Sequence, residues 1–192
     1  MGTVAAALVV TLVGYHLGRP GFMGSPVSDR PAPALVMPDD NGGIFDLAQQ
    51  HGGLVLIYFG YRNCPDVCPT TLADLRAVMD ALGSDAAMVS VVFVTLDPHH
   101  DTPAAVRDYL SSFTPIDGRS FIGLVGGTDD TAAAAARWGV TWRSTDDGRF
   151  IDHTSVVTVI DLSGHRRLRF GAGQTGDPKA VARDLRALLH GA

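Results

Sequence analysis

The sequence predicts an α/β domain in which a central mixed sheet is flanked by helices. Two runs of the 192-residue chain, 54–61 and 88–96, are almost entirely apolar, which is typical of strands buried on both faces. Each run is followed by a segment with the apolar spacing or the capping residues of a helix. A hairpin and a last helix are expected to close the chain. Strands and helices in this order should form one sheet covered on both faces.

The remaining elements are expected from local signals. Residues 34–47 predict two short strands around a turn at 40–43, which adds a hairpin before the first buried strand. Pro69 is expected at the first position of the next helix, and Gly83 just after its end. The later elements are a helix from 103 to about 113, a strand at 121–125, a helix at 131–138, a hairpin of 149–160 with 165–170, and a helix at 179–189. This order is that of the thioredoxin-like fold with an extra N-terminal β-hairpin.

The first 33 residues differ in composition from the rest. Residues 3–17 are apolar apart from two threonines, a tyrosine and a histidine, and a segment rich in proline, glycine and serine follows. This length lies between that of a signal-peptide core and that of a spanning helix. We expect residues 1–18 to be a signal peptide or membrane anchor, 19–33 a linker, and 34–192 the folded domain. No small-x-small cleavage site is evident, which favours the anchor. Either way the domain, membrane-anchored or secreted, should lie on the extracytoplasmic (periplasmic) side.

Composition excludes some functions and points to one site. The net charge is -5 and the basic residues are scattered, so the sequence lacks the basic stripe of a nucleic-acid-binding protein. The two cysteines, Cys64 and Cys68, are too few for a disulfide-stapled fold. A close pair in a polar loop indicates shared chemistry: a disulfide, a metal, or both in alternation.

The cysteine loop joins the first buried strand to the next helix, a common position for active-site loops. Cys68 is expected at the helix N-cap, where the partial positive charge favours its thiolate. Three intervening residues can bring both sulfurs to one side of a turn, close enough for a disulfide or for one ion. A pair of thiolates prefers Cu(I), or else zinc. Since two ligands rarely complete a site, a third donor is expected elsewhere in the chain.

His153 is the best candidate for that donor. It stands at the start of an apolar strand whose entry, in a thioredoxin-like topology, faces the cysteine loop. Thioredoxins carry a cis-proline there that shields the dithiol from metal, and this chain has none next to His153. The alternative is a hydrogen-bonded histidine at a strand start. His99 and His100 follow the second buried strand, where solvent exposure is expected and an auxiliary copper contact is the alternative.

These residues together resemble the SCO/SenC family of copper chaperones for cytochrome c oxidase, over about residues 30–190. The resemblance is carried by residues 58–69 (YFGYRNCPDVCP), 96–103 (LDPHHDTP), 121–124 (FIGL) and 152–154 (DHT). They are similar to the family's F-G-Y-T-x-C-P-D-V-C-P, D-P-x-R-D-T, F-x-G-L and D-H-T. Two departures change the charge around the site: Arg62-Asn63 replaces the common Thr-His, and His99-His100 replaces an acidic-Arg pair.

The resemblance implies that Cys64, Cys68 and His153 bind one copper ion. It also implies delivery of copper to the dinuclear copper site of cytochrome c oxidase subunit II, or upkeep of that site's cysteines. The partners would then be subunit II and an upstream copper donor, with attachment to the membrane through the N-terminal segment. The chain would act primarily as a chaperone, and an enzymatic activity is left open.

Two other functions fit the same loop. An exported thiol–disulfide oxidoreductase would use Cys64 or Cys68 as the attacking thiolate. A peroxidase-like enzyme of this fold would need a nearby arginine and threonine, for which Arg62 and Thr70 or Thr71 are candidates. The sequence contains no established peroxidase motif, so this function ranks last.

Overall fold

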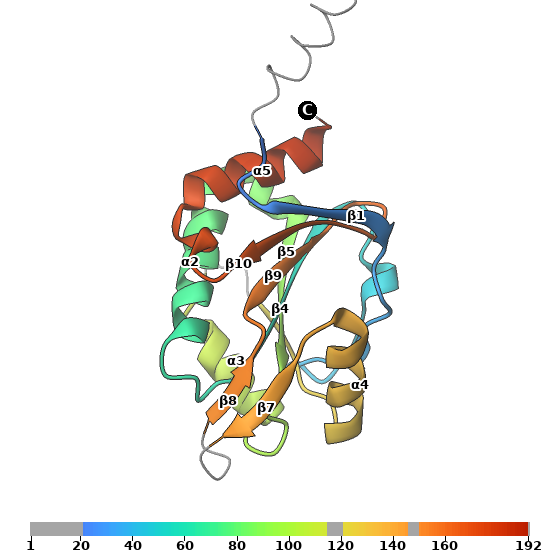
Figure 1. Ribbon diagram of the computed structural model, residues 1–192, viewed down its shortest axis with the longest axis vertical. Helices are drawn as coiled ribbons and strands as arrows, with labels where there is room; N and C mark the ends of the chain where they lie inside the picture. The colour runs from blue at the N-terminus through green and yellow to red at the C-terminus, as the bar shows by residue number, and fades with distance from the viewer. Residues whose placement is uncertain (1–20, 115–120, 146–149, 192) are drawn as a thin grey trace, which may run out of the picture.

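A computed structural model describes residues 21–114, 121–145 and 150–191 of the chain. Six strands form a mixed central sheet in the order β1-β10-β9-β4-β5-β6 (Figure 1). Its strands are β1 (Ser25–Pro31), β10 (His165–Gly171), β9 (Val156–Ile160), β4 (Leu54–Gly60), β5 (Val89–Thr95) and β6 (Ile122–Leu124). The strands β4, β5 and β6 are parallel, whereas β9 is antiparallel to both β4 and β10, and β1 is antiparallel to β10. The expected central mixed sheet is therefore confirmed.

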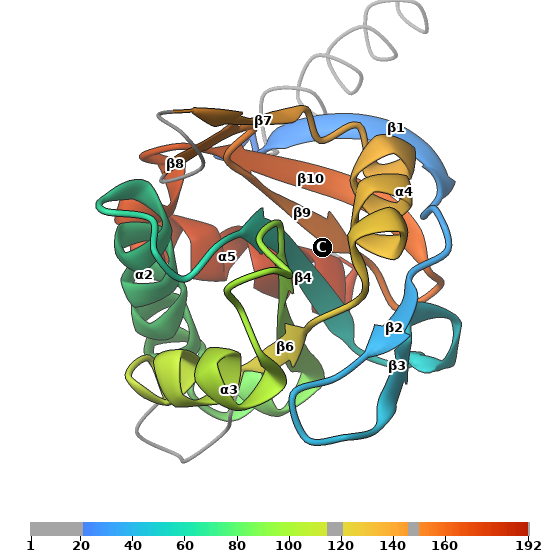
Figure 2. The same ribbon diagram turned by 90° about the horizontal axis from the view of Figure 1, so that it is seen from below.

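Helices cover both faces of this sheet. The helices α2 (Val67–Leu82) and α5 (Pro178–His190) pack together on one face, and α4 (Thr128–Trp138) covers the opposite face (Figures 1 and 2). The helix α3 (Pro103–Ser111) lies beside β6. Short 3-10 turns occupy Leu47–Gln49, Gly83–Met88 and Gln174–Gly176. The helices expected at 103–113, 131–138 and 179–189 are confirmed within a few residues, as helix ends usually are.

The strand β4, which leads into the cysteine loop, is buried along its whole length. It pairs with β5 on one side and with β9 on the other. Tyr58 and Leu56 on this strand have no exposed surface, and Phe93 of β5 packs against Tyr58 with ring centroids 6.1 Å apart. A strand paired on both edges and buried on both faces fixes the starting point of the loop that follows it.

The expected N-terminal hairpin is confirmed as β2 (Val36–Pro38) and β3 (Ile44–Asp46). It attaches to the free edge of β6 through two backbone hydrogen bonds. The Asp40 N–H donates to the Gly123 carbonyl at 2.9 Å, and the Val125 N–H donates to the Pro38 carbonyl at 3.0 Å. The hairpin thereby shields an edge of the sheet that would otherwise expose unpaired backbone groups.

Of the two expectations for the N-terminal part of the chain, one is corrected and the other lies outside the described residues. Residues 25–31 were expected within a linker, yet they form β1 at the edge of the sheet. The proposed signal or anchor, 1–18, lies outside the described residues. Among the residues that are described, no helix is long and apolar enough to cross a membrane.

A second correction concerns the strand expected at 149–160. Of this segment, Phe150–His153 forms β8 and Val156–Ile160 forms β9, with a break between them. The strand β8 leaves the central sheet and pairs with β7 (Trp142–Thr145), a strand that the sequence did not predict. His153 therefore ends β8 and does not begin β9. The break lets it turn towards the cysteine loop.

Candidate metal centre

The two cysteines lie where β4 passes into α2. Cys64 is partly buried in the connecting loop, and Cys68 is fully buried. The helix begins at Val67, so Cys68 occupies its first turn and not the N-cap, and Pro69 is its third residue. The Cys68 N–H donates to Cys64 Sγ at 3.4 Å. The Cys64 sulfur thus accepts one of the backbone N–H groups that have no partner within the helix.

This geometry reverses the expected roles of the two sulfurs. A hydrogen bond from the Cys68 thiol holds the pKa of Cys64 far below its ordinary value despite partial burial, and backbone N–H groups at the helix start act in the same direction. The same hydrogen bond, together with burial, raises the pKa of Cys68. The pKa of Cys64 thus lies below that of Cys68, which is the opposite of the order expected from a Cys68 at the N-cap.

His153 meets the cysteines from the end of β8. Its Nε2 lies 3.6 Å from Cys68 Sγ. Its Nδ1 lies 3.1 Å from the carbonyl oxygen of Thr154, to which it donates when it carries the proton. That hydrogen bond selects the tautomer in which Nε2 offers its lone pair towards the sulfurs, the usual arrangement of a metal-binding imidazole.

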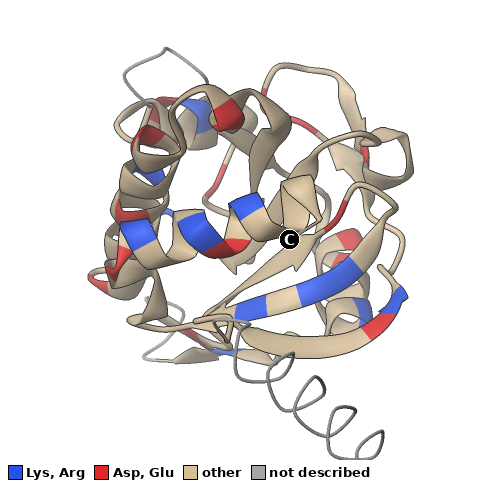
Figure 3. Cartoon of the chain, turned by 90° about the horizontal axis from the view of Figure 1, so that it is seen from above, with Lys and Arg blue, Asp and Glu red and all other residues tan. Residues whose placement is uncertain are grey.

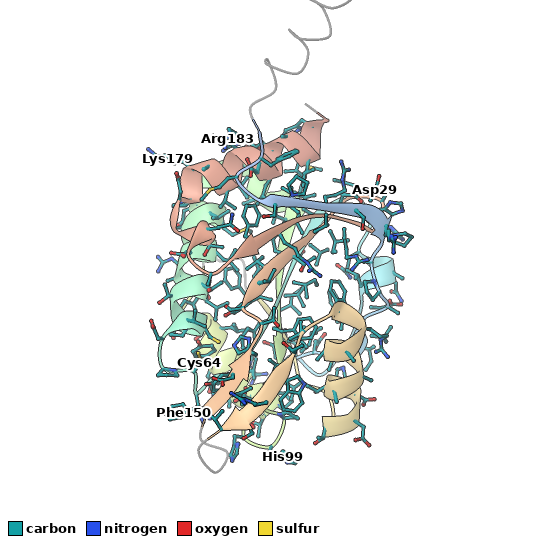
Figure 4. The ribbon with its side chains drawn as sticks, viewed as in Figure 1. Asp29, Cys64, His99, Phe150, Lys179 and Arg183 are labelled. Atoms are coloured by element: carbon teal, nitrogen blue, oxygen red, sulfur yellow. The ribbon has the colours of Figure 1, made fainter. Side chains whose placement is uncertain are left out.

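Two tyrosines hold the histidine ring in place. The rings of Tyr58 and Tyr61 meet the His153 ring edge-on, with centroids 6.4 and 6.0 Å away. The Tyr61 hydroxyl also accepts a hydrogen bond from the Ile151 N–H at 3.2 Å. Because Ile151 lies two residues before His153 on β8, this bond ties the strand to the end of β4. Figure 4 shows Cys64 at this end of the molecule, below the ribbon of the central sheet.

The strand β7, which sequence analysis missed, supports His153 from the other side. Trp142 is the β-pairing partner of His153. The Thr154 N–H donates to the Thr141 carbonyl at 2.9 Å, and the two threonine hydroxyls are 2.9 Å apart. An open groove of about 340 Å³ runs beside the histidine, lined by Thr141, Trp142, Arg143, Asp152, His153 and Thr154. The groove leaves His153 reachable from solvent.

Arg62, one of the departures from the family pattern, fixes the cysteine loop from a different direction. Its backbone N–H donates to Asp101 Oδ2 at 3.1 Å, and its guanidinium Nε lies 3.4 Å from Asp101 Oδ1. Asp101 is 1% exposed and also accepts a hydrogen bond from the Thr95 hydroxyl at 2.6 Å. Arg62 is thus engaged in an ion pair, which leaves it poorly placed to polarise a peroxide at Cys64.

His99 and His100 are exposed, as expected. His100 Nδ1 contacts the Asp97 carboxylate at 2.9 Å, and His99 Nε2 lies 3.4 Å from the Thr128 hydroxyl. Both rings are engaged with neighbours of their own loop or of α4. Neither hydrogen-bonds to the cysteines in the described part of the chain.

The donor set suits a soft metal ion. It consists of two sulfurs and one imidazole nitrogen, a combination that favours Cu(I) or zinc. Across residues 21–114, 121–145 and 150–191, no three His, Cys, Asp or Glu side chains are already arranged around a common point. Cys68 contacts both other donors, so the three side chains are neighbours in an open arrangement.

Comparison with known proteins identifies the family of the chain. The profile of the family SCO1/SenC matches residues 32–190. The SCO2-like protein of Rickettsia conorii is 35% identical over 131 residues, which cover 66% of this chain and 62% of that protein. The chain thus spans somewhat less than two thirds of this relative.

Two solved structures are similar over most of the domain. ScoI of Bradyrhizobium japonicum, solved with copper bound, is 32% identical with a TM-score of 0.73 and covers 83% of this chain and 100% of that one. Apo Sco1 of Thermus thermophilus is 31% identical with a TM-score of 0.77 and covers 88% and 98%.

Fold and site together define a thioredoxin-like domain with a C-x-x-x-C dithiol and a histidine beside it. The chain belongs to the SCO1/SenC family.

Proposed function

We propose that this protein is a copper chaperone that binds one copper ion through Cys64, Cys68 and His153. The observation that carries the proposal is that Cys68 contacts both other candidate ligands. Its Sγ lies 3.6 Å from His153 Nε2, and its thiol hydrogen-bonds to Cys64. The ion is cargo, so the site must release it as well as bind it. Ligands from two separate segments, the cysteine loop and the end of β8, can be exchanged one at a time with those of an acceptor.

The protein's own groups prepare the site for a soft cation. Cys64 already holds its negative charge against the start of α2, so it needs no deprotonation. Cys68, whose pKa is raised, must lose its proton, and binding should therefore weaken as the pH falls. The contact of His153 Nδ1 with the Thr154 carbonyl turns Nε2 towards the sulfurs.

The acceptor we propose is the dinuclear copper site of cytochrome c oxidase subunit II, with an upstream donor that loads the chaperone. Membership of the SCO1/SenC family and the copper-bound Bradyrhizobium relative support this assignment. The groove beside His153 would let an acceptor reach the histidine ligand first. The domain would work on the extracytoplasmic side, held there by the segment at 1–18.

Copper stoichiometry of the reduced, anaerobic protein tests the proposal. We expect about one copper per chain in the wild type, none in the Cys64→Ser, Cys68→Ser double variant, and much weaker binding in His153→Ala. A matched control is His100→Ala, a histidine that contacts Asp97 and lies outside the donor set. Equal copper retention in wild type and His153→Ala, or no binding by the wild type, would contradict the proposal.

A second candidate, an exported thiol–disulfide oxidoreductase, is favoured by the unequal cysteines. Cys64 is a partly exposed thiolate beside a buried thiol, the usual arrangement of an attacking and a resolving cysteine. Cys64 would attack a substrate disulfide and release one substrate thiol. The Cys68 sulfur would then attack Cys64, forming a protein disulfide and freeing the second thiol.

The two functions separate at His153. Reduction of a disulfide-bonded peptide needs only the two sulfurs, so His153→Ala would retain it. Copper binding needs the imidazole. Two results together would select the oxidoreductase: His153→Ala reduces the peptide at the wild-type rate, and the wild-type protein binds no copper.

A further inference from the structure

We propose that the end of the domain opposite the cysteines is a docking surface for an anionic lipid bilayer. The surface is the exposed side of α5 together with the start of β1, and we call it the α5 face. The inference rests on the proposed membrane segment at 1–18. It adds to that segment a defined orientation, in which the copper-binding end points away from the membrane.

Basic side chains form a single stripe along α5. They recur at intervals of four, three and four residues, which places them on one side of the helix. The stripe consists of Lys179, Arg183, Arg186 and His190. Lys179 is exposed, and the side chains of Arg183, Arg186 and His190 keep 53%, 42% and 56% of their surface. Figure 3, which looks down on this end, shows the three Lys and Arg positions in a row along the helix.

Acidic residues neutralise this stripe only in part. The helix α5 contains three Lys or Arg and one Asp, Asp184, with Asp177 at its N-cap. Asp184 is 2% exposed; it accepts a hydrogen bond from the Gly24 N–H at 2.9 Å and pairs with Arg183 at 3.3 Å. Asp85 contacts Arg186 at 3.0 Å and His190 at 3.4 Å. Lys179 is exposed beside these pairs, and the paired Arg183 keeps 53% of its side-chain surface.

The described chain begins against this same face. The bond from Gly24 to Asp184 joins the start of the chain to α5. Gln174 also donates to the Met23 carbonyl at 3.1 Å. The apolar run at 3–17 thus precedes a point that is fixed beside Arg183, and Figure 4 shows Lys179 and Arg183 at this end. An apolar segment attached here brings the α5 face to any membrane that it enters.

An aromatic residue completes the pattern. Phe22 is 38% exposed at the point where the chain meets the domain. Exposed aromatic rings with Lys and Arg beside an apolar segment are the usual composition of a bilayer interface.

The opposite end has the opposite charge. The loops and helix starts around the cysteines carry more acidic than basic residues. The acidic ones are Asp66, Asp97, Asp101, Asp129, Asp130 and Asp152. Of these, Asp66, Asp129, Asp130 and Asp152 are exposed, and Asp152 is paired with Arg143, whereas Asp97 and Asp101 are 9% and 1% exposed. Charge should therefore favour contact of an anionic surface with the α5 face over contact with the copper-binding end.

The size of the effect follows from the charge of anionic lipids. Each Lys or Arg at an anionic surface strengthens binding by about fivefold, and the attraction is screened within roughly 8–10 Å at physiological salt. Two or three such residues on a tethered domain are enough to keep it on the bilayer for most of the time.

The experiment uses the single lysine of the chain, Lys179, as a natural probe. The full-length protein is reconstituted into phosphatidylcholine vesicles, or into vesicles with about 30% phosphatidylglycerol, and treated with a water-soluble amine acylating reagent. Peptide mass spectrometry then gives the acylation rate of Lys179. The variant Arg143→Lys adds a second lysine at the copper-binding end, because Arg143 is exposed on β7. The acylation rate of this second lysine reports the general effect of an anionic surface on amines.

We expect Lys179 to be acylated at least about fivefold more slowly on the anionic vesicles than on the neutral ones. The lysine introduced by Arg143→Lys should be acylated at equal rates on both kinds of vesicle. Protection of Lys179 should disappear in 1 M salt and in Arg183→Glu. It should remain in Arg76→Glu, a matched charge reversal at a 43% exposed arginine on α2. Equal acylation of Lys179 on both vesicles, or equal protection of both lysines, would overturn the docking surface.

Flotation of the same samples separates this inference from the proposed anchor. A chain that floats with both vesicle types and shows Lys179 protection on the anionic one supports both. A chain that floats only with anionic vesicles removes the anchor and supports the α5 face. A chain that floats with neither overturns the docking surface together with the anchor.

Discussion

At the scale of single residues, the site depends on where two sulfurs and one ring meet. Cys64 accepts the Cys68 N–H, Cys68 contacts His153, and His153 donates to the Thr154 carbonyl. Each group is fixed by a neighbour in a different element. The spacing C-x-x-x-C predicts the pair of sulfurs, but their unequal pKa values follow from the hydrogen bond between them and from the burial of Cys68. The helix α2 starts two residues before the position expected from Pro69. A proline at the third helical position is tolerated because its missing N–H has no partner within the helix.

The unequal cysteines predict a pH profile of alkylation for the metal-free protein. Because the pKa of Cys64 is far below its ordinary value, its thiolate persists when the pH falls. Its reaction with iodoacetamide should change little between pH 5 and 8, whereas that of an ordinary thiol falls about tenfold per pH unit. Cys68, buried and with a raised pKa, should remain unmodified. Mass spectrometry of the modified peptides measures both, and a tenfold rise per pH unit at Cys64 would contradict the assignment.

Gly60, the last residue of β4, makes room for the buried sulfur. A Cβ there would lie 3.0 Å from Cys68 Sγ and 2.8 Å from the Phe93 ring. Gly60→Ala should lower the free energy of unfolding by about 1–3 kcal/mol and weaken copper binding, because Cys68 must shift. Urea unfolding and copper titration measure the two effects. Gly127→Ala is the control, since its Cβ would meet nothing closer than 3.7 Å, and similar losses in both variants would argue against a local clash.

At the scale of elements, the sequence predicts the buried strands and misses the exposed ones. The strands β4 and β5 are recognisable because both of their faces are apolar. The strand β7 is polar and short, and its pairing with β8 depends on tertiary contacts that no local pattern contains. The strand β1 contains two prolines and looks like a linker. An edge strand tolerates them because one side of its backbone needs no partner.

The contact between β8 and the end of β4 predicts an effect of Tyr61→Phe. Without the hydroxyl, the Ile151 N–H loses its acceptor in a buried position. We expect a loss of about 1–3 kcal/mol in the free energy of unfolding, with weaker copper binding because His153 is held less firmly. Tyr109→Phe is the matched control, since the Tyr109 hydroxyl is buried without a hydrogen-bond partner among the described residues. If both variants behave alike, the bond to Ile151 has no special role.

The turn between β9 and β10 predicts a pH-dependent contribution to stability. Burial alone would raise the pKa of Asp161, but hydrogen bonds from His165, Ser163 and Arg167 outweigh it and lower the pKa to about 2. A pKa that is lower in the folded state adds stability above the ordinary value of 3.8, and this is lost as the pH falls through 2. Asp161→Asn should therefore cost about 1–2 kcal/mol at pH 7 and much less near pH 2. Urea unfolding at both pH values measures the difference, and an equal cost at both would contradict the assignment.

At the scale of the whole molecule, binding at one end of the sheet should stabilise the entire fold. The donors belong to the β4–α2 connection and to β8, two segments separated by more than 80 residues of chain. An ion held between them binds the folded state and not the unfolded one. At a free copper concentration of 100 Kd, this linkage raises the free energy of unfolding by about 2.7 kcal/mol, which corresponds to an increase in Tm of roughly 5–11 °C for a domain of this size.

Calorimetry with buffered Cu(I) measures this increase, which should vanish in Cys64→Ser and shrink in His153→Ala. It should persist in a His99→Ala, His100→Ala double variant, because those rings contact Thr128 and Asp97 outside the donor set.

The increase in Tm should also be smaller at low pH, because Cys68, with its raised pKa, must release a proton when the ion binds. Cys64 is already ionised, so about one proton should be released per copper bound. Release of two protons, or a Tm that rises equally in Cys64→Ser, would show that the ion binds elsewhere or that the two sulfurs are equivalent.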